Sequence, residues 1–210
     1  MKSDYAASLA HLKKDPHFAP LIKKYGLPEI DRYHGKIDVF HALLRSIIYQ
    51  QLSGKAAATI LGRVETLFPD NRPMPETLLK IRAPRLRKAG LSMQKIGYVR
   101  DLALKIIDGT VDQRKFSKMT SDEIIEHVTA VKGIGEWTAH MLLIFSLNRL
   151  DILPTGDLGI RKGFQSVYGL KKLPTAKEME KLARDWRTHA SVAAWYLWRV
   201  ADERKTNKVV

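Results

Sequence analysis

The stretch "VKGIGEWTAHMLLIFSLNRLDILPTGD", residues 131–157, carries the strongest structural signal in the chain. It places Gly133 and Gly135 one residue apart ahead of an apolar run, and it closes on Asp157 after a proline turn. Both glycines can take a positive φ angle and bring bare backbone close to a partner. The apolar run predicts a helix over 136–148, whose unpaired N-terminal N–H groups face the glycine turn. Such a turn favours an anion, typically a phosphate.

The segment before the glycines is also predicted to be helical. Thr120 and Glu123 form a capping-box pattern that opens a helix over 120–130. The order is therefore helix, glycine hairpin, helix. A plain helix–helix connection is the alternative, because glycine turns are common. A nucleotide-binding loop is disfavoured, since no strand precedes the glycines and no GK[ST] follows them.

Amphipathic helical spacing recurs along nearly the whole chain. Asp15 with Pro16 is expected to start a helix that Gly26 ends, and Asp38, Ser92 and Thr175 are expected to cap three others. No segment combines sustained alternation with β-branched enrichment. The sequence therefore predicts an all-α fold. The break "RLDILPTGD", residues 149–157, is expected to separate two helical lobes.

Composition and charge narrow the class of protein. The chain has 210 residues, 45% of them hydrophobic, which predicts a compact globular protein and not a disordered one. Its formal net charge of +14 favours a polyanionic partner. We find no transmembrane run and no signal-peptide core. We therefore expect no membrane association and a cytoplasmic, nucleoid-associated location, or a nuclear one in a eukaryote.

The absence of cysteine excludes several kinds of site. Disulfides, thiolate zinc sites, iron–sulfur clusters and cysteine nucleophiles all need a residue that the chain lacks. The seven histidines form no HExxH-type or closely spaced pair, so a catalytic zinc is not expected.

Several motifs together resemble one family. "VKGIGEWTAHMLLIF" followed by "LPTGDLGIRKGF" is similar to the helix-hairpin-helix plus Gly/Pro/Asp signature of the base-excision DNA glycosylases, in particular the 3-methyladenine DNA glycosylase II branch. The flanking "IIYQQLSGKAA", "AGLSMQKIGYVRDLA" and "WRTHASVAAWYLWR" resemble further elements of that family, in its order, between about residues 38 and 199. The resemblance implies a DNA-repair enzyme that flips a damaged base out of the duplex.

The same resemblance implies a domain organisation. A six-helix lobe over residues 38–150 would carry the wedge and the helix-hairpin-helix. A second helical lobe, formed by residues 1–37 and 151–210, would carry the catalytic carboxylate. The active site would occupy the cleft between the lobes, and Trp186 is expected to pack between them.

Asp157 is the predicted catalytic residue. It stands where the family carries its catalytic carboxylate, and its alternative role is as the N-cap of the following helix. An N-alkylated purine already carries positive charge, so its glycosidic bond breaks without strong protonation and leaves a sugar with oxocarbenium character. A nearby carboxylate can stabilise that cation and orient water. We therefore expect Asp157 to be catalytic.

Trp137 distinguishes the subclasses. In family members that also nick the strand, a lysine at this position attacks the sugar to form a Schiff base. An indole cannot do so, and the resemblance therefore implies a monofunctional glycosylase. A bifunctional glycosylase/AP lyase and a non-catalytic helix-hairpin-helix DNA-binding module are the two alternatives.

The resemblance also implies a base pocket and a wedge. Aromatic side chains attract a cationic base through stacking and cation–π contacts. Packing in the hydrophobic core is the alternative role for such aromatic residues. An extruded base leaves a gap that another residue must fill. Gln51 is the expected wedge, with Leu52 as the alternative. The expected pocket residues are Trp137, Trp195, Trp198, Tyr49 and Met141.

The hairpin is expected to anchor the DNA backbone. The candidate phosphate-binding residues are Gly133, Gly135, Lys132 and Thr138. "KIRAPRLRKAGLSMQKIGYVRD" holds seven basic residues against one acid and would extend the basic face, although a solvated surface is the ordinary reading. The resemblance adds a Na⁺ or K⁺ ion at the main-chain carbonyls of Thr129, Val131 and Ile134.

The expected partner is double-stranded DNA that contains damaged bases, bound by a monomer that needs no cofactor. One departure from the family pattern stands before the last helix. Many relatives read Pro-Tyr-Arg-Ser there, whereas this chain reads Thr188, His189, Ala190, Ser191 and so lacks the arginine.

Overall fold

The computed structural model describes residues 5–30 and 38–206, and throughout this part every regular element is a helix. No strand occurs among these residues, so the predicted all-α fold is confirmed. None of the described helices is both long and apolar enough to span a lipid bilayer.

The chain divides into two compact units. We call Gly35–Leu142 the hairpin unit, and Met1–His34 together with Leu143–Val210 the carboxylate unit. One division falls within residues 31–37, where the predicted lobe boundary at residue 37 also lies, outside the described residues. The other falls after Leu142, whereas the predicted boundary after residue 150 stays a prediction.

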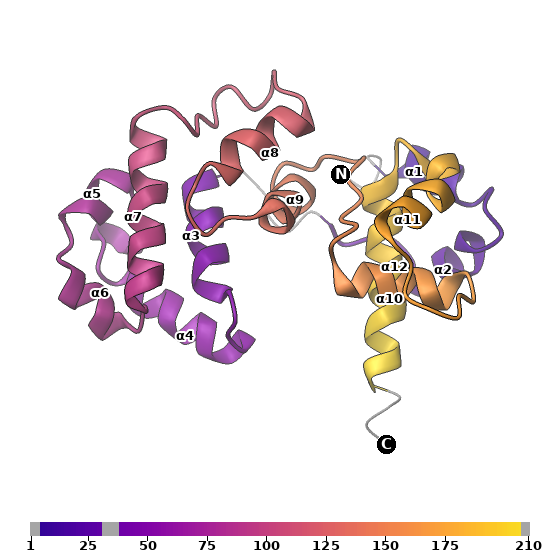
Figure 1. Ribbon diagram of the computed structural model, residues 1–210, viewed down its shortest axis with the longest axis horizontal. Coiled ribbons are helices and arrows are strands. Elements are labelled where there is room, and N and C mark those ends of the chain that lie inside the picture. The colour runs from indigo at the N-terminus through magenta and orange to yellow at the C-terminus, as the bar shows by residue number, and fades with distance from the viewer. Residues whose placement is uncertain (1–4, 31–37, 207–210) are drawn as a thin grey trace. The chain divides into compact units, whose positions relative to one another are not determined.

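A central helix organises the hairpin unit. This helix is α7, Met93–Ile107. The other elements are α3 (Val39–Tyr49), α4 (Gly54–Glu65), η1 (Pro69–Asn71), α5 (Pro75–Lys80), α6 (Ala83–Ala89), α8 (Ser121–Thr129) and α9 (Glu136–Phe145), which runs past Leu142. Helices α3, α5 and α6 pack against α7, and α4 packs against α3 and α6 (Figure 1). The apolar residues buried in this unit include Leu43, Leu78, Leu86, Val99 and Leu102.

Local sequence signals set the helix ends in this unit. The Asp38 side chain accepts from the His41 amide, and the Ser92 side chain accepts from the Lys95 amide, as predicted. The predicted capping box of Thr120 is also confirmed. Helix α9 ends at Phe145 and not at 148 as predicted. At Asn148 the backbone takes a φ of 51°, a left-handed conformation that cannot continue a right-handed helix.

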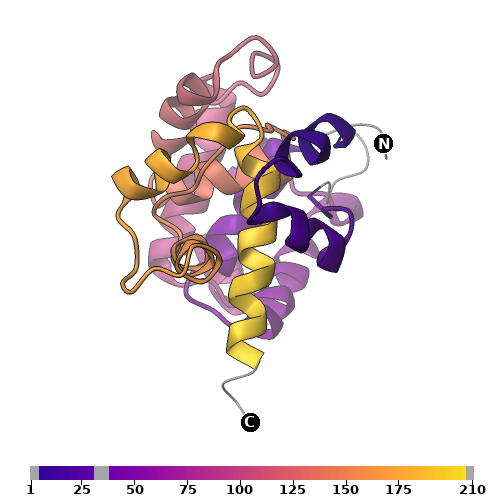
Figure 2. The same cartoon turned by 90° about the vertical axis from the view of Figure 1, so that its right-hand side faces the viewer.

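The longest helix of the carboxylate unit is α12, Ala190–Thr206. Around it lie α1 (Ala6–Leu12), α2 (Phe18–Tyr25), α10 (Leu158–Val167), α11 (Ala176–Leu182) and η2 (Arg184–Trp186). Helices α1, α2 and α10 pack against α12 (Figure 2). Thr175 and Glu178 form the predicted capping box of α11.

Trp186 belongs to the core of the carboxylate unit. Its ring lies 4.9 Å from that of Phe18 and 5.4 Å from that of Phe164, and the residue is 1% exposed. Both neighbours are residues of the same unit. The expectation that Trp186 packs between lobes is therefore wrong, because aromatic partners within its own unit cover the indole.

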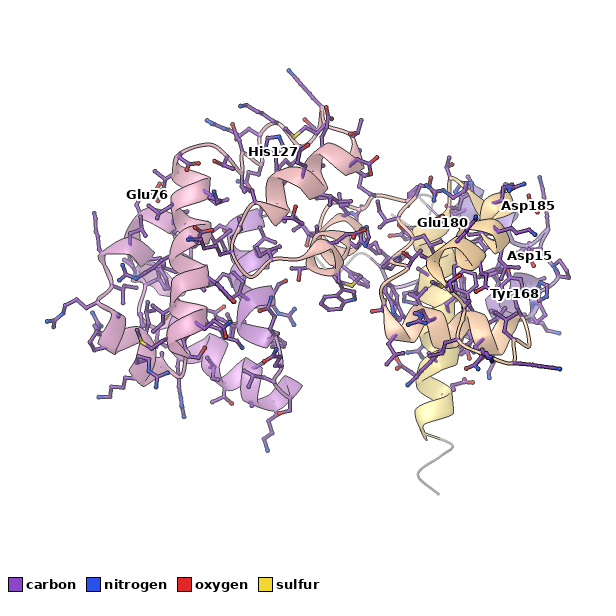
Figure 3. All side chains as sticks on the ribbon, in the orientation of Figure 1. Asp15, Glu76, His127, Tyr168, Glu180 and Asp185 are labelled. Carbon is purple, nitrogen blue, oxygen red and sulfur yellow. The ribbon has the colours of Figure 1, made fainter. Side chains whose placement is uncertain are left out.

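Asp15 organises the turn before α2. Its main-chain carbonyl accepts from the Phe18 amide at 3.1 Å, and its side chain accepts from the His17 amide at 2.8 Å. The Tyr168 hydroxyl lies 3.5 Å from the same carboxylate (Figure 3), and burial raises the pKa of that tyrosine. Helix α2 thus begins at Phe18, after this turn, and not at Pro16 as predicted, although Gly26 ends it as expected.

Candidate functional site

The hairpin between α8 and α9 uses its two glycines differently. Gly133 has a φ of 80°, which an L-residue with a side chain adopts only at a cost, whereas Gly135 does not take a positive φ. The expectation of a left-handed conformation is thus met at Gly133 alone. The Ile134 amide donates to the Val131 carbonyl at 3.1 Å and closes the turn. The Gly135 carbonyl accepts from the Ala139 amide at 3.1 Å, which starts α9.

Helix α7 braces this hairpin with two side chains. A Cβ atom at Gly133 would lie 2.2 Å from Cδ2 of Tyr98, so only glycine fits against that ring. The Gln94 side-chain amide donates to the Tyr98 hydroxyl at 2.6 Å and fixes the ring. Asp101 accepts from the Lys132 amide at 2.8 Å. The backbone of the hairpin is therefore fixed by side chains that lie more than thirty residues earlier in the sequence.

The predicted phosphate-binding residues do not share one environment. Lys132, Gly133 and Gly135 are exposed, so they can meet a DNA backbone. Thr138 is 5% exposed, and its amide donates to the Gly135 carbonyl at 2.9 Å. Its predicted contact with phosphate stays a prediction that its burial does not favour.

Helix α8, which leads into the hairpin, is held at its far side as well. His127, on α8 (Figure 3), bonds through Nδ1 with the Thr110 carbonyl at 2.7 Å. Because Thr110 lies in the loop after α7, both the hairpin and the helix before it are fastened to the same part of the hairpin unit.

The predicted wedge residues lie in the turn that joins α3 to α4. Gln51 has a φ of 57°, and its side chain is exposed, as is that of Leu52. The neighbouring Gln50 donates from its side-chain amide to the Gly133 carbonyl at 2.7 Å. Residues 50–52, which we call the wedge turn, are thereby tied directly to the hairpin.

The predicted pocket residues fall on both units. Tyr49, Trp137 and Met141 belong to the hairpin unit, and Trp195 and Trp198 belong to the carboxylate unit. Trp137 is 49% exposed in the first turn of α9, so core packing does not explain it. The Arg45 guanidinium lies 4.2 Å from the centre of the Tyr49 ring.

Asp157 caps α10 and also bonds with an indole. Its Oδ1 accepts from the Ile160 amide at 2.8 Å and from Trp198 Nε1 at 2.9 Å. The Trp198 ring is stacked on Phe145, with centroids 5.6 Å apart. The capping role and a fixed, half-buried carboxylate thus coexist, because two donors from different helices hold one oxygen.

Two glycines four residues apart let α12 reach that carboxylate. A Cβ atom at Gly159 would lie 2.9 Å from Asp157 Oδ1 and equally far from Trp198 Cδ1. One at Gly163 would lie 2.6 Å from the Leu197 carbonyl oxygen. Residues four apart share one face of a helix, so this face of α10 lies close against α12. In the sequence these glycines stand as "GIRKG", a spacing that is itself a signal for close helix packing.

The loop that delivers Asp157 is fastened to the start of α12. Ser191 is fully buried, and its hydroxyl donates to the Arg149 carbonyl at 2.6 Å and accepts from the Ile152 amide at 3.0 Å. The Arg187 guanidinium pairs with Asp151 at 2.8 Å. In the segment that departs from the family pattern, the serine that this chain retains thus helps to fix the loop.

The basic run over 80–101 is only partly available to a ligand. Three of its seven basic residues donate to main-chain carbonyls of the hairpin unit, each at 2.7–2.9 Å: Arg87, Lys95 and Arg100. The remaining four are exposed and can contribute to a basic face: Lys80, Arg82, Arg85 and Lys88. Three basic residues of the run thus make hydrogen bonds within the unit, and four remain exposed to a ligand.

Comparison with known proteins identifies the superfamily to which this chain belongs. Residues 44–188 match the family described as HhH-GPD superfamily base excision DNA repair protein. The chain belongs to this superfamily, whose helix-hairpin-helix corresponds here to α8, the glycine hairpin and α9.

Several individual proteins of known name or structure are similar to this chain. DNA-3-methyladenine glycosylase 1 of Schizosaccharomyces pombe is 34% identical over 189 residues, which cover 89% of this chain and 83% of the relative. A solved structure of the 3-methyladenine DNA glycosylase of that yeast, in complex with abasic DNA, aligns with a TM-score of 0.83 at 33% identity, over 94% of this chain and 97% of that one. A DNA-3-methyladenine glycosidase from Bacillus halodurans aligns with a TM-score of 0.84 at 34% identity, over 98% and 94%.

Proposed function

We propose that this protein is a monofunctional DNA glycosylase that removes alkylated, cationic purines such as 3-methyladenine or 7-methylguanine from duplex DNA. The observation that carries the proposal is the fixed carboxylate of Asp157, held through Oδ1 by an α10 amide at 2.8 Å and by Trp198 Nε1 at 2.9 Å. Relatives named as DNA-3-methyladenine glycosylases support the substrate class.

The chemistry needs one well-placed anion. The bond between C1′ of the sugar and the purine nitrogen breaks, and its electron pair leaves with the base, which thereby loses its positive charge. The sugar is left with oxocarbenium character, and the Asp157 carboxylate stabilises it electrostatically. Water then adds to C1′ and gives up a proton, so the products are a free methylated purine and an abasic site. Because the carboxylate is already oriented, little reorganisation accompanies the step.

Trp137 supports release of the base without strand cleavage. It stands in the first turn of α9, where the lyase members of the family carry their lysine nucleophile, and an indole forms no Schiff base. We propose that Trp137, Trp195 and Trp198, with Tyr49 and Met141, receive the cationic base through their aromatic and polarisable faces.

On the DNA side, we propose that a monomer grips the backbone through the exposed hairpin. Gly133, Gly135 and Lys132 would contact phosphates, and Gln51, or else Leu52, would fill the gap that the extruded base leaves. Binding should weaken steeply as salt rises, because phosphate contacts release counterions.

We propose that the same hairpin also binds a monovalent cation. Main-chain carbonyl oxygens are the hard ligands that Na⁺ or K⁺ takes. The Thr129 carbonyl lies at the C-terminal end of α8, where helix carbonyls lack partners in the next turn. We propose that Thr129, Val131 and Ile134 would hold such an ion, which would strengthen the attraction of the hairpin for phosphate. No chemical step depends on it.

Chemical product analysis tests the proposed function. The protein is incubated with duplex DNA that carries 7-methylguanine, and free base and strand breaks are quantified with and without borohydride. We expect release of the free base, no strand cleavage and no covalent adduct trapped by borohydride. A trapped adduct would indicate a glycosylase/lyase, and binding without any release would indicate a non-catalytic DNA-binding module.

A further inference from the structure

The wedge turn adopts a backbone conformation that its own sequence does not favour. Gln51 has a φ of 57°, in the left-handed region that a residue with a side chain rarely occupies. The Leu52 amide donates back to the carbonyl of Tyr49, the last residue of α3, at 3.3 Å. Such a conformation persists only where surrounding structure holds it. The relevant contacts therefore come from outside the turn.

Lys95 on α7 provides two of these contacts. Its Nζ donates to the Ile48 carbonyl at 2.7 Å and to the Gln50 carbonyl at 2.8 Å. These carbonyls lie at the C-terminal end of α3, where the helix leaves its last carbonyls unpaired and carries partial negative charge. Burial lowers the pKa of Lys95, yet the amine keeps N–H donors in either protonation state. One side chain thus holds the end of α3 and the first residue of the wedge turn.

The same face of α7 holds the hairpin. Tyr98 and Asp101 follow Lys95 at intervals of three residues, a spacing that keeps side chains on one face of a helix. The Tyr98 ring lies against Gly133, and Asp101 accepts from the Lys132 amide at 2.8 Å. Gln50 links the wedge turn directly to the hairpin, because its side-chain amide donates to the Gly133 carbonyl at 2.7 Å. Wedge turn, α7 and hairpin are therefore mutually fastened within the hairpin unit.

From this arrangement we propose that Lys95 is a positioning residue for base extrusion. It holds the wedge turn in fixed register with the hairpin, so that the turn enters the base stack at a set distance from the phosphates that the hairpin grips. The inference rests on the proposed function, and it adds a role for a residue that contacts neither the base nor the sugar. A basic residue in this run would otherwise be read as a phosphate contact.

The test distinguishes an effect on extrusion of the base from an effect on cleavage of the glycosidic bond. Lys95→Met removes the donors and keeps most of the aliphatic stem. Single-turnover release of 7-methylguanine is measured from a duplex in which the lesion faces cytosine, and from the same duplex with an abasic site opposite the lesion, where extrusion is easier. We expect release to slow about 10-fold on the paired duplex and less than about 3-fold on the other, because only the first depends on a well-placed wedge.

Two further variants control for charge and for donor chemistry. Lys118→Met removes an exposed positive charge from the loop between α7 and α8 of the same unit and should release base from both duplexes at nearly the wild-type rate. Lys95→Arg keeps charge and donors and should recover most of the rate on the paired duplex. If Lys95→Met unfolds below the assay temperature, Lys95→Gln, which keeps a donor, should give the same difference between duplexes in weaker form.

Each outcome decides one question. Equal slowing of Lys95→Met on both duplexes, or equal slowing by Lys118→Met, would overturn the positioning role. If Lys95→Gln is the variant used, equal rates on the two duplexes relative to wild type would overturn it as well. Absence of release by the wild-type protein from either duplex would overturn the proposed function itself. The two failures are thus distinguishable.

Discussion

The hairpin unit and the carboxylate unit fix their candidate functional groups in opposite ways. In the hairpin unit the groups are main-chain atoms of residues 132–135, held by the side chains of Gln50, Tyr98 and Asp101. In the carboxylate unit the group is the side chain of Asp157, held by a main-chain amide and an indole N–H. Main-chain atoms suit a repeating backbone of phosphates, whereas bond cleavage needs one anion at one position.

The largest effect is expected from Asp157→Asn. Asparagine caps helices about as well as aspartate, so α10 should keep its start and the thermal midpoint should change little. Loss of the charge should lower single-turnover release by about 100- to 1000-fold, ~3 to 4 kcal/mol, the usual effect of one electrostatic group in an active site. Affinity for DNA, measured by fluorescence anisotropy, should stay near the wild-type value. A variant that still releases base at more than a tenth of the wild-type rate would contradict the catalytic role.

Gly133→Ala should be the next most damaging change, and it acts on the other unit. The added Cβ meets the Tyr98 ring, and alanine resists the φ of 80°. We expect a loss of about 1 to 3 kcal/mol in the free energy of unfolding, measured by urea denaturation. Gly135→Ala is the matched control, because its Cβ meets nothing within 4 Å. If both alanine variants were equally stable, the account of the hairpin would fail.

Trp198→Phe should reduce turnover moderately. Phenylalanine keeps an aromatic ring beside Phe145 but removes the N–H that donates to Asp157. Loss of this bond to a half-buried carboxylate should slow release about 10-fold, ~1 to 2 kcal/mol. Trp195→Phe on the same helix serves as the comparison, and we expect less than about a 3-fold change there. Equal losses in the two variants would show that ring size matters and the donated hydrogen bond does not.

The smallest effects should come from the two capping boxes, one in each unit. Thr120→Ala and Thr175→Ala should each cost about 1 kcal/mol of stability. The amides of these threonines, and then their hydroxyls, lower the pKa of Glu123 and of Glu178, and alanine keeps the amide but loses the hydroxyl that donates to the carboxylate. A lowered carboxyl pKa gives stability that is present above the unfolded-state pKa and is lost as pH falls through the folded-state pKa. Denaturation curves at neutral and acidic pH should therefore show each mutational loss shrinking in acid by the part that the hydroxyl-to-carboxylate bond contributes.

Sequence reasoning succeeded where partners lie close together along the chain. The caps at Asp38, Ser92, Thr120 and Thr175 bond with amides three residues away, so residue type and spacing were enough to predict them. The helix-hairpin-helix order and the all-α class followed from the same kind of local pattern. Local rules failed at Asn148, whose left-handed backbone ends α9 early.

The contacts that bring distant residues together at the candidate site could not be predicted from sequence spacing. Trp198 and Asp157 are separated by 41 residues, and Lys95 and Ile48 by 47. Such pairs depend on which helix faces pack together, which a single sequence does not specify. Lys95 looked like one of seven basic surface residues, and only packing shows that its ammonium points at two carbonyls. The spacing of Gly159 and Gly163 was a usable signal for close helix packing.

The central claim is that the hairpin unit binds the DNA backbone and that the carboxylate unit cleaves the glycosidic bond. It is tested most directly by measuring DNA affinity and single-turnover release in parallel for Asp157→Asn and Gly135→Ala. The account predicts that Asp157→Asn binds like wild type and releases almost no base. It predicts that Gly135→Ala, whose new methyl group intrudes where phosphate approaches, binds more weakly but releases base at the wild-type rate once the DNA is saturated. Parallel loss of binding and release in both variants, or undiminished release by Asp157→Asn, would contradict it.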